Sequence, residues 1–137
     1  MAESSGHLRG VRVVADDAGV VGGVVDDDDM PVLYRAADVL AFPSTREGFG
    51  LVVLEAAASG LPVVVSDLPG FCEFMQDGRD GLMAPVGDPG ALADGLVRAV
   101  NDQRLREGLV AQGRETAARF AWASTAEHTE DVYRAFL

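Results

Sequence analysis

The sequence predicts an α/β fold, with a mostly parallel sheet that carries helices on both of its faces. Short apolar runs, such as 61–65, alternate along the chain with longer segments whose apolar residues recur at helical spacing, such as 89–100. The run at 61–65 is continuously apolar, which is typical of a parallel strand buried on both faces. Ligands of such sheets bind at the carboxyl ends of the strands, so we expect the site at that edge.

The individual elements follow from apolar spacing, glycine and proline. Residues 1–10 lack periodicity and are expected to form a tail, and 11–137 to form one domain. Strands are predicted at 11–15 (at the sheet edge), 20–25, 39–42, 61–65 and 82–84, and helices at 30–37, 51–59, 70–75, 89–100, 105–120 and 124–136. Asp29 and Asp88 stand where helix N-caps are expected, ahead of prolines. The aromatic side chains expected in the core are those of Tyr34, Trp122, Tyr133 and Phe136.

The composition is that of a single soluble domain. The chain has 137 residues, 48% of them hydrophobic, which is enough for a core. No apolar run approaches the roughly 20 residues of a membrane span. The segment 1–10 has no apolar signal-peptide core, so we expect a cytoplasmic protein. The single cysteine, Cys72, excludes an internal disulfide and a cysteine-based zinc cluster, and is expected to be a plain core or loop residue.

The charge limits the partners and the chemistry. The net charge is −11, and all eleven positive side chains are arginine. This balance repels phosphate backbones, so we expect neither nucleic acid nor an anionic membrane surface as a partner. Without lysine the chain has no P-loop and no Schiff base. The first ligand of any bound phosphate must therefore be a backbone amide or an arginine.

Four consecutive aspartates, 26–29, allow two interpretations. Carboxylate oxygens suit Ca²⁺ or Mg²⁺. Consecutive positions on a short loop cannot all converge on one ion, however, and Asp29 stands at a helix N-cap. We therefore interpret the run as a solvated acidic loop that begins a helix.

The stretch 43–55 is the most informative one for function. An apolar run that ends at Phe42 precedes it, and an alanine-rich helical segment starts at its end, so it reads as strand, tight loop and helix. Gly48 and Gly50 remove side chains at the turn, which lets a bound group approach the first amides of the helix, where the dipole favours an anion. At roughly 1.5 Å rise per residue, Glu47 and Glu55 lie about 10 Å apart, which suits two polyol groups that flank a diphosphate.

This pattern resembles the E-x7-E signature of retaining GT-B glycosyltransferases of family 4, the glycosyl transferases group 1. The resemblance runs from near Gly23 almost to Leu137. Two glutamates at a fixed spacing are a weak signal, but the surrounding residues make it strong. They read LYRAADVLAFPS at 33–44, EAAASGLPVVVSD at 55–67 and DGRDGLMAPVGDPGALA at 77–93.

The resemblance implies a single Rossmann-like domain, the C-terminal, donor-binding half of a GT-B enzyme. It implies that the ribose hydroxyls of a nucleotide-diphosphate sugar, a UDP-sugar or a GDP-sugar, bind to Glu55. Glu47, the implied catalytic residue, binds hydroxyls of the transferred sugar. The remaining implied donor-binding residues are Gly48, Phe49, Gly50, Leu51 and, near the base, Val25. It implies no metal and no cofactor. The Phe49 side chain either meets the donor or only fastens the loop to the core.

Several parts of the family's pattern are missing. The family usually has a glycine where Pro69 stands and a proline where Cys72 stands. The acceptor-binding N-terminal domain is absent, and so is the lysine that helps to neutralise the diphosphate, which Arg9 or Arg12 would have to replace. We therefore expect this half alone to be inactive.

Two other functions remain to be weighed. One is a stand-alone module that binds a nucleotide or a sugar without transferring it. The other is a receiver-type regulatory domain, suggested by the acidic pair that follows the first strand, Asp16 and Asp17. A receiver requires a lysine after its fifth strand, and the absence of lysine makes this alternative poor.

Overall fold

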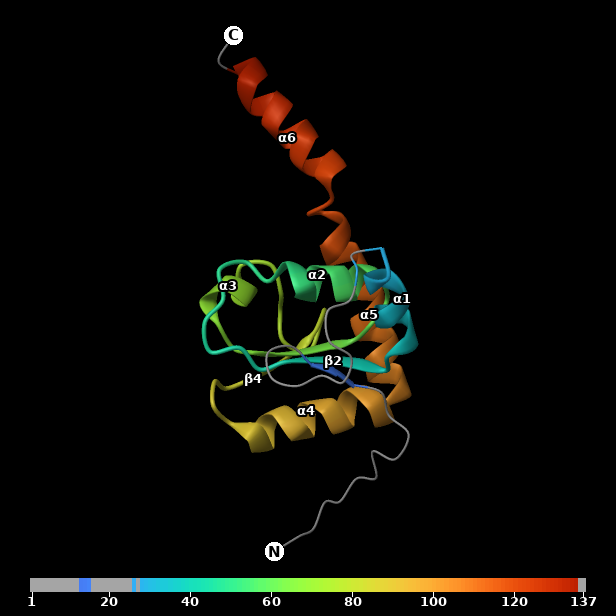
Figure 1. The fold of residues 1–137 in the computed structure, drawn as a ribbon. Helices are drawn as coiled ribbons and strands as arrows, with labels where there is room; N and C mark the ends of the chain where they lie inside the picture. Colours follow the sequence, from blue (N-terminus) through green and yellow to red (C-terminus); the bar gives the residue numbers. More distant parts are fainter. Residues whose placement is uncertain (1–12, 16–25, 27, 136–137) are drawn as a thin grey trace, which may run out of the picture.

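The residues that the structure describes form an α/β domain built on a four-stranded parallel sheet (Figure 1). The structure, a computed structural model, describes residues 13–15, 26 and 28–135. The strands β1 (Val13–Ala15), β2 (Val39–Phe42), β3 (Val63–Ser66) and β4 (Leu82–Ala84) lie side by side in chain order. All three pairings are parallel, with registers such as Ala41↔Val64 and Val64↔Leu82. β1 forms the predicted edge strand, whereas the predicted tail and the strand at 20–25 lie outside the described residues.

Helices cover both faces of the sheet, as predicted. α4 (Pro89–Asn101) lies along one face, and α2 (Leu51–Ala58) lies on the other, with α5 (Gln103–Ala118) packed against α2 (Figure 1). α1 (Met30–Ala36) precedes β2, and the four-residue helix α3 (Pro69–Cys72) follows β3. α6 (Trp122–Ala135) extends away from the rest of the domain (Figure 1).

The core consists of two apolar clusters, one on each face of the sheet. Successive strand residues point to opposite faces. Leu40, Val63 and Val65 therefore join the cluster beneath α2 and α5, while Val39 and Val64 join the one beneath α4. All five are fully buried, which explains why the strands read as continuous apolar runs.

Several element boundaries differ slightly from the prediction, among them the start of β3 and the end of α3. The strand predicted at 61–65 begins at Val63, because Pro62 has no N–H to donate to the ladder. Its carbonyl still accepts a hydrogen bond from Leu40 N (2.9 Å).

Asp88 caps α4 as predicted, accepting from Ala91 N (2.9 Å). Asp29 occupies the N-cap position of α1, but its side chain makes no capping bond.

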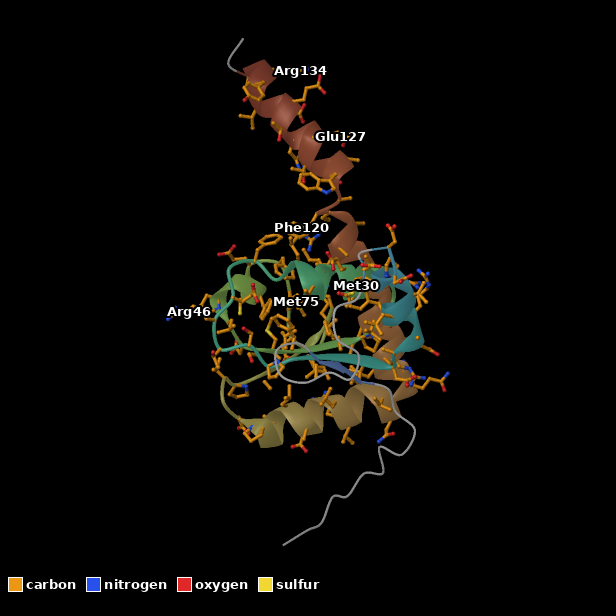
Figure 2. The ribbon with its side chains drawn as sticks, viewed as in Figure 1. Met30, Arg46, Met75, Phe120, Glu127 and Arg134 are labelled. Atoms are coloured by element: carbon orange, nitrogen blue, oxygen red, sulfur yellow. The ribbon has the colours of Figure 1, made fainter. Side chains whose placement is uncertain are left out.

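The prediction that the aromatic residues of the last helix belong to the core is wrong. Trp122 is 88% exposed and Tyr133 is 68% exposed, and no described residue of α6 is buried. Phe136 lies outside the described residues. Helical spacing of apolar residues shows that a helix has an apolar face, but it does not show which surface covers that face. Figure 2 shows Arg134 near the projecting end of α6 and Glu127 closer to the body.

Candidate functional site

The loop between β2 and α2 turns sharply at the carboxyl end of the sheet, and Gly50 makes the turn possible. Gly50 is the N-cap of α2 and has φ = 80°, a left-handed conformation that side chains disfavour. A Cβ added there would also overlap the ring of Phe71. The loop therefore needs glycine at position 50 for two separate reasons.

The start of α2 presents a row of free amides. The amides of Phe49, Gly50, Leu51 and Val52 have no hydrogen-bond partner within the part of the chain that the structure describes. The next amide, that of Val53, bonds to the Gly50 carbonyl (3.0 Å). Free amides and the positive end of the helix dipole form a site for an anion.

The short helix α3 supports this loop from beneath. A Cβ at Gly70 would lie 3.1 Å from the Gly48 carbonyl oxygen and 3.3 Å from that of Glu47, so the two backbones pack closely. Pro69, where the family has glycine, fits the first position of α3, where an amide would have no partner within the helix. Proline at position 69, in place of the usual glycine, therefore leaves the contact between α3 and the loop intact.

The other departure, Cys72, is exposed and hydrogen-bonded. Its Sγ donates to Asp67 Oδ1 (3.2 Å), and this bond, together with desolvation and the carboxylate charge, raises the pKa of the thiol. Cys72 is thus a surface residue of α3, held in its protonated form.

Glu55 lies on the second turn of α2 and is positioned by Tyr34 of α1. The Tyr34 hydroxyl donates to Glu55 Oε2 (3.2 Å). Tyr34 is 2% exposed, which confirms its prediction as a core residue, while Glu55 is exposed. The two residues line a cavity of about 510 Å³ between α1 and α2, together with Met30, Pro31, Ala58 and Ser59.

Glu47 lies in the loop and is half-buried. Its Oε1 accepts a bond from the amide of the next residue, Gly48 (3.2 Å). A ligand that takes the Gly48 amide must therefore displace this carboxylate, which would then be free for a hydroxyl group.

Phe49 fastens the loop to the body. Its ring contacts those of Phe74 and Phe120, with both pairs of centroids 5.6 Å apart. The ring is still 40% exposed, and Leu51 is 63% exposed. These two residues and Trp122 line an open apolar groove of about 710 Å³ between α2 and the junction of α5 with α6, which we call the apolar groove. Figure 2 shows Phe120 at this junction.

The structure brings most of the predicted site residues together. Glu47, Gly48, Phe49, Gly50 and Leu51 form the loop and the first turn of α2, and Glu55 follows one turn later. Val25, Arg9 and Arg12 lie outside the described residues. In the described part of the acidic run, Asp26, Asp28 and Asp29 are exposed. Among the described residues no cluster of three His, Cys, Asp or Glu side chains could hold a metal ion.

Sequence reasoning missed the bond between Tyr34 and Glu55, and it missed a buried carboxylate. Asp80 is 4% exposed, and its two oxygens accept from Gln76 N (2.6 Å) and from Thr116 Oγ1 (2.8 Å) of α5. Tyr34 and Glu55 are 21 positions apart, and Asp80 and Thr116 are 36 apart, so local patterns carry no signal for these two bonds.

Comparison with known proteins identifies the family. The family model described as "Glycosyl transferases group 1" matches residues 4–102. The chain belongs to the glycosyl transferases group 1 family. As a group 1 domain it has the expected Rossmann-like α/β fold of the C-terminal half of a GT-B enzyme. No helix in the described part of the chain is long and apolar enough to cross a membrane.

Several relatives of this group 1 domain are much longer than the chain itself. It is 43% identical over 112 residues to the phosphatidyl-myo-inositol mannosyltransferase of Mycobacterium leprae, covering 81% of this chain and 30% of that protein. The Anabaena protein Alr3699/HepE, solved in complex with UDP-glucose, has a TM-score of 0.71 at 27% identity, over 78% of this chain and 30% of that one. The C-terminal domain of a group 1 family protein from Francisella tularensis has a TM-score of 0.65 at 30% identity, over 72% and 50% of the two chains.

Proposed function

We propose that this chain is the donor-binding half of a retaining glycosyltransferase, which transfers a sugar from a nucleotide-diphosphate sugar to an acceptor. The observation that carries the proposal is the start of α2, where free amides lie between two carboxylates, Glu47 and Glu55. A nucleotide sugar offers hydroxyl groups on both sides of a diphosphate, so its chemistry matches this order of groups.

The diphosphate would bind at the amides of Phe49 to Val52. A Cβ at Gly48 would meet no atom within 4 Å, so this glycine leaves the backbone open to the diphosphate. The dipole of α2 stabilises the charge that develops as the leaving group departs. Arg46, in the same loop, points away from the body (Figure 2). We therefore assign the phosphate contacts of the described residues to backbone amides.

The ribose would bind in the cavity between α1 and α2. Tyr34 donates to only one oxygen of Glu55, so the carboxylate keeps acceptor positions for a diol. The cavity, about 510 Å³, has the size of a small-molecule pocket. Glu47, released from the Gly48 amide, would accept from hydroxyls of the transferred sugar. We expect no metal and no cofactor, and a cytoplasmic location; these expectations rest on the sequence.

The other half of the enzyme would supply the acceptor site. The curated relatives that the chain matches are about three times as long as the matched region. The apolar groove and the exposed aromatic residues of α6 form a surface that a second domain would cover. We propose that this domain is an N-terminal GT-B half, without which the chain transfers no sugar.

Calorimetric titration of the purified chain with UDP, UDP-glucose, UDP-N-acetylglucosamine, GDP-mannose and free glucose tests the donor site. We expect one nucleotide sugar to bind, and Glu55→Gln to weaken it by about tenfold or more through the lost hydrogen bonds. Glu115→Gln, an exposed glutamate on α5, is the matched control and should leave binding unchanged. Equal weakening by both variants, or no binding of any donor at millimolar concentration, would overturn the donor site.

A stand-alone binding module remains the second candidate, because the chain spans only 30% of the mannosyltransferase that it resembles. The two functions differ in turnover. If donor binds, and an N-terminal half from a relative is added with an acceptor, sugar transfer supports the glycosyltransferase. Donor binding without transfer in such mixtures supports the module.

A further inference from the structure

A small hollow lies at the carboxyl ends of the strands, on the face of the sheet that α4 covers. Its volume is about 310 Å³. It is lined by Pro43 and Thr45 from the loop after β2, by Ser66 and Ala84 at the ends of β3 and β4, and by Asp88 and Leu92 at the start of α4. We call it the Ser66 pocket.

The alternation of side chains along the strands explains why space remains there. On the face beneath α4 the strands carry the core residues Val64 and Leu82. Two residues further along, the same face carries Ser66 and Ala84. These small side chains do not fill the space that a valine or a leucine would occupy, so the core ends in a hollow.

Ser66 lines this hollow, and its hydroxyl has no partner among the described residues. Ser66 is 4% exposed, and its hydroxyl makes no hydrogen bond with any residue that the structure describes. Among these residues every side-chain oxygen or nitrogen that is completely shielded has a partner. The Ser66 oxygen is therefore reachable, and the hollow that it lines gives access to it. A hydroxyl that lines a hollow and has no partner in the protein can donate to and accept from a ligand that enters the hollow.

The surrounding groups favour a neutral ligand that carries hydroxyl groups. Ser66 and Thr45 both donate and accept, and a carboxylate oxygen of Asp88 accepts. Asp88 Oδ1 already accepts from Ala91 N (2.9 Å) and places a negative charge at the positive end of α4. An anion is thereby disfavoured. The walls formed by Pro43, Ala84 and Leu92 suit the C–H face of a saturated ring.

We propose that the Ser66 pocket binds a polyol ring, such as a hexose or a cyclitol, through the hydroxyl of Ser66. The pocket lies on the opposite face of the sheet from α2, and the loop 43–50 contributes to both sites. Binding here does not depend on the proposed donor site, which lies at the start of α2.

Titration of the ¹⁵N-labelled chain, followed by amide shifts, tests the proposal with myo-inositol, glucose and inorganic phosphate as probes. We expect one of the polyols to shift the amides of Thr45, Ser66 and Gly87 at millimolar concentration. Ser66→Ala should weaken this binding about tenfold, the contribution of one neutral hydrogen bond. Ser124→Ala, a serine on α6 whose hydroxyl donates to the Ala118 carbonyl, is the matched control and should change nothing.

The amide spectrum itself shows whether each variant is folded. Ser66→Val fills the hollow and should therefore abolish binding of the polyol while the protein stays folded. UDP added to the same sample should shift the amides of α2 if the donor site exists. The two sites are therefore tested independently of each other. The proposal is overturned if neither polyol shifts these amides, if Ser66→Ala binds as well as the unchanged chain, or if phosphate shifts them and the polyols do not.

Discussion

At the scale of single residues, the site depends on pairs that only folding brings together. Glu55 is a plain exposed glutamate on its helix until the buried hydroxyl of Tyr34, 21 positions earlier, donates to it. Glu47, by contrast, finds its partner in the next amide along the chain. The first carboxylate is held by tertiary structure and the second by its own loop.

Tyr34→Phe tests whether this pairing matters for the donor. The ring remains to fill the core, so we expect the free energy of unfolding to fall by only about 1 kcal/mol. The affinity for the donor should fall several-fold, up to about tenfold, because Glu55 loses the group that orients it. Chemical denaturation and calorimetry measure the two effects. Unchanged donor affinity in a folded variant would show that Tyr34 serves the core alone.

At the scale of elements, the loop and α2 illustrate how two glycines in one motif differ. Gly50 combines a positive φ with close contact to Phe71, whereas a Cβ at Gly48 would meet no atom within 4 Å. The sequence alone does not distinguish the roles of the two glycines. The left-handed backbone at Gly50 and the packing of α3 beneath the loop distinguish them.

Gly50→Ala should therefore destabilise the protein far more than Gly48→Ala. For Gly50→Ala we expect a loss of about 2–4 kcal/mol, from the left-handed backbone and the overlap with the Phe71 ring. For Gly48→Ala we expect a change within about 0.5 kcal/mol, as for an ordinary surface substitution. Urea denaturation of both variants measures the difference, and equal losses would contradict the assigned roles.

At the scale of the whole molecule, α6 differs from the rest of the domain because none of its described residues is buried. The sheet is covered on both faces, while α6 projects from the body with Trp122 exposed and lying beside the apolar groove. Large exposed apolar side chains that gather at one place mark a surface for a partner. In a chain that spans 30% of the mannosyltransferase that it matches, a further domain is the partner that we propose.

Trp122 reports directly on this proposal, since it is the only tryptophan in the chain. In the isolated protein we expect emission typical of a solvent-exposed indole, strongly quenched by acrylamide. Addition of an N-terminal half from a group 1 relative should shift the emission to shorter wavelength and reduce the quenching. Trp122→Phe is the control for signal from the added half. A mixture that binds, as judged by sedimentation, without a change at Trp122 would place the interface elsewhere.

The sequence by itself determined the fold class, the strands from β2 to β4, the cap at Asp88, and the loop and helix that carry Glu47 and Glu55. These features depend on local chemistry: apolar runs, glycine, proline and aspartate act on the backbone within a few residues. The same local information placed Tyr34 in the core correctly and Trp122 and Tyr133 wrongly, because spacing reveals an apolar face but not what covers it.

The tertiary structure decided everything that depends on residues distant in sequence. It paired Tyr34 with Glu55, packed Phe49 against Phe74 and Phe120, and set Asp80 beneath Thr116. It also left Ser66 beside a hollow at the end of a sheet face, where nothing in the apolar run before it indicates such a space. Burial and hydrogen bonding are properties of the assembled layers, so no local pattern specifies them.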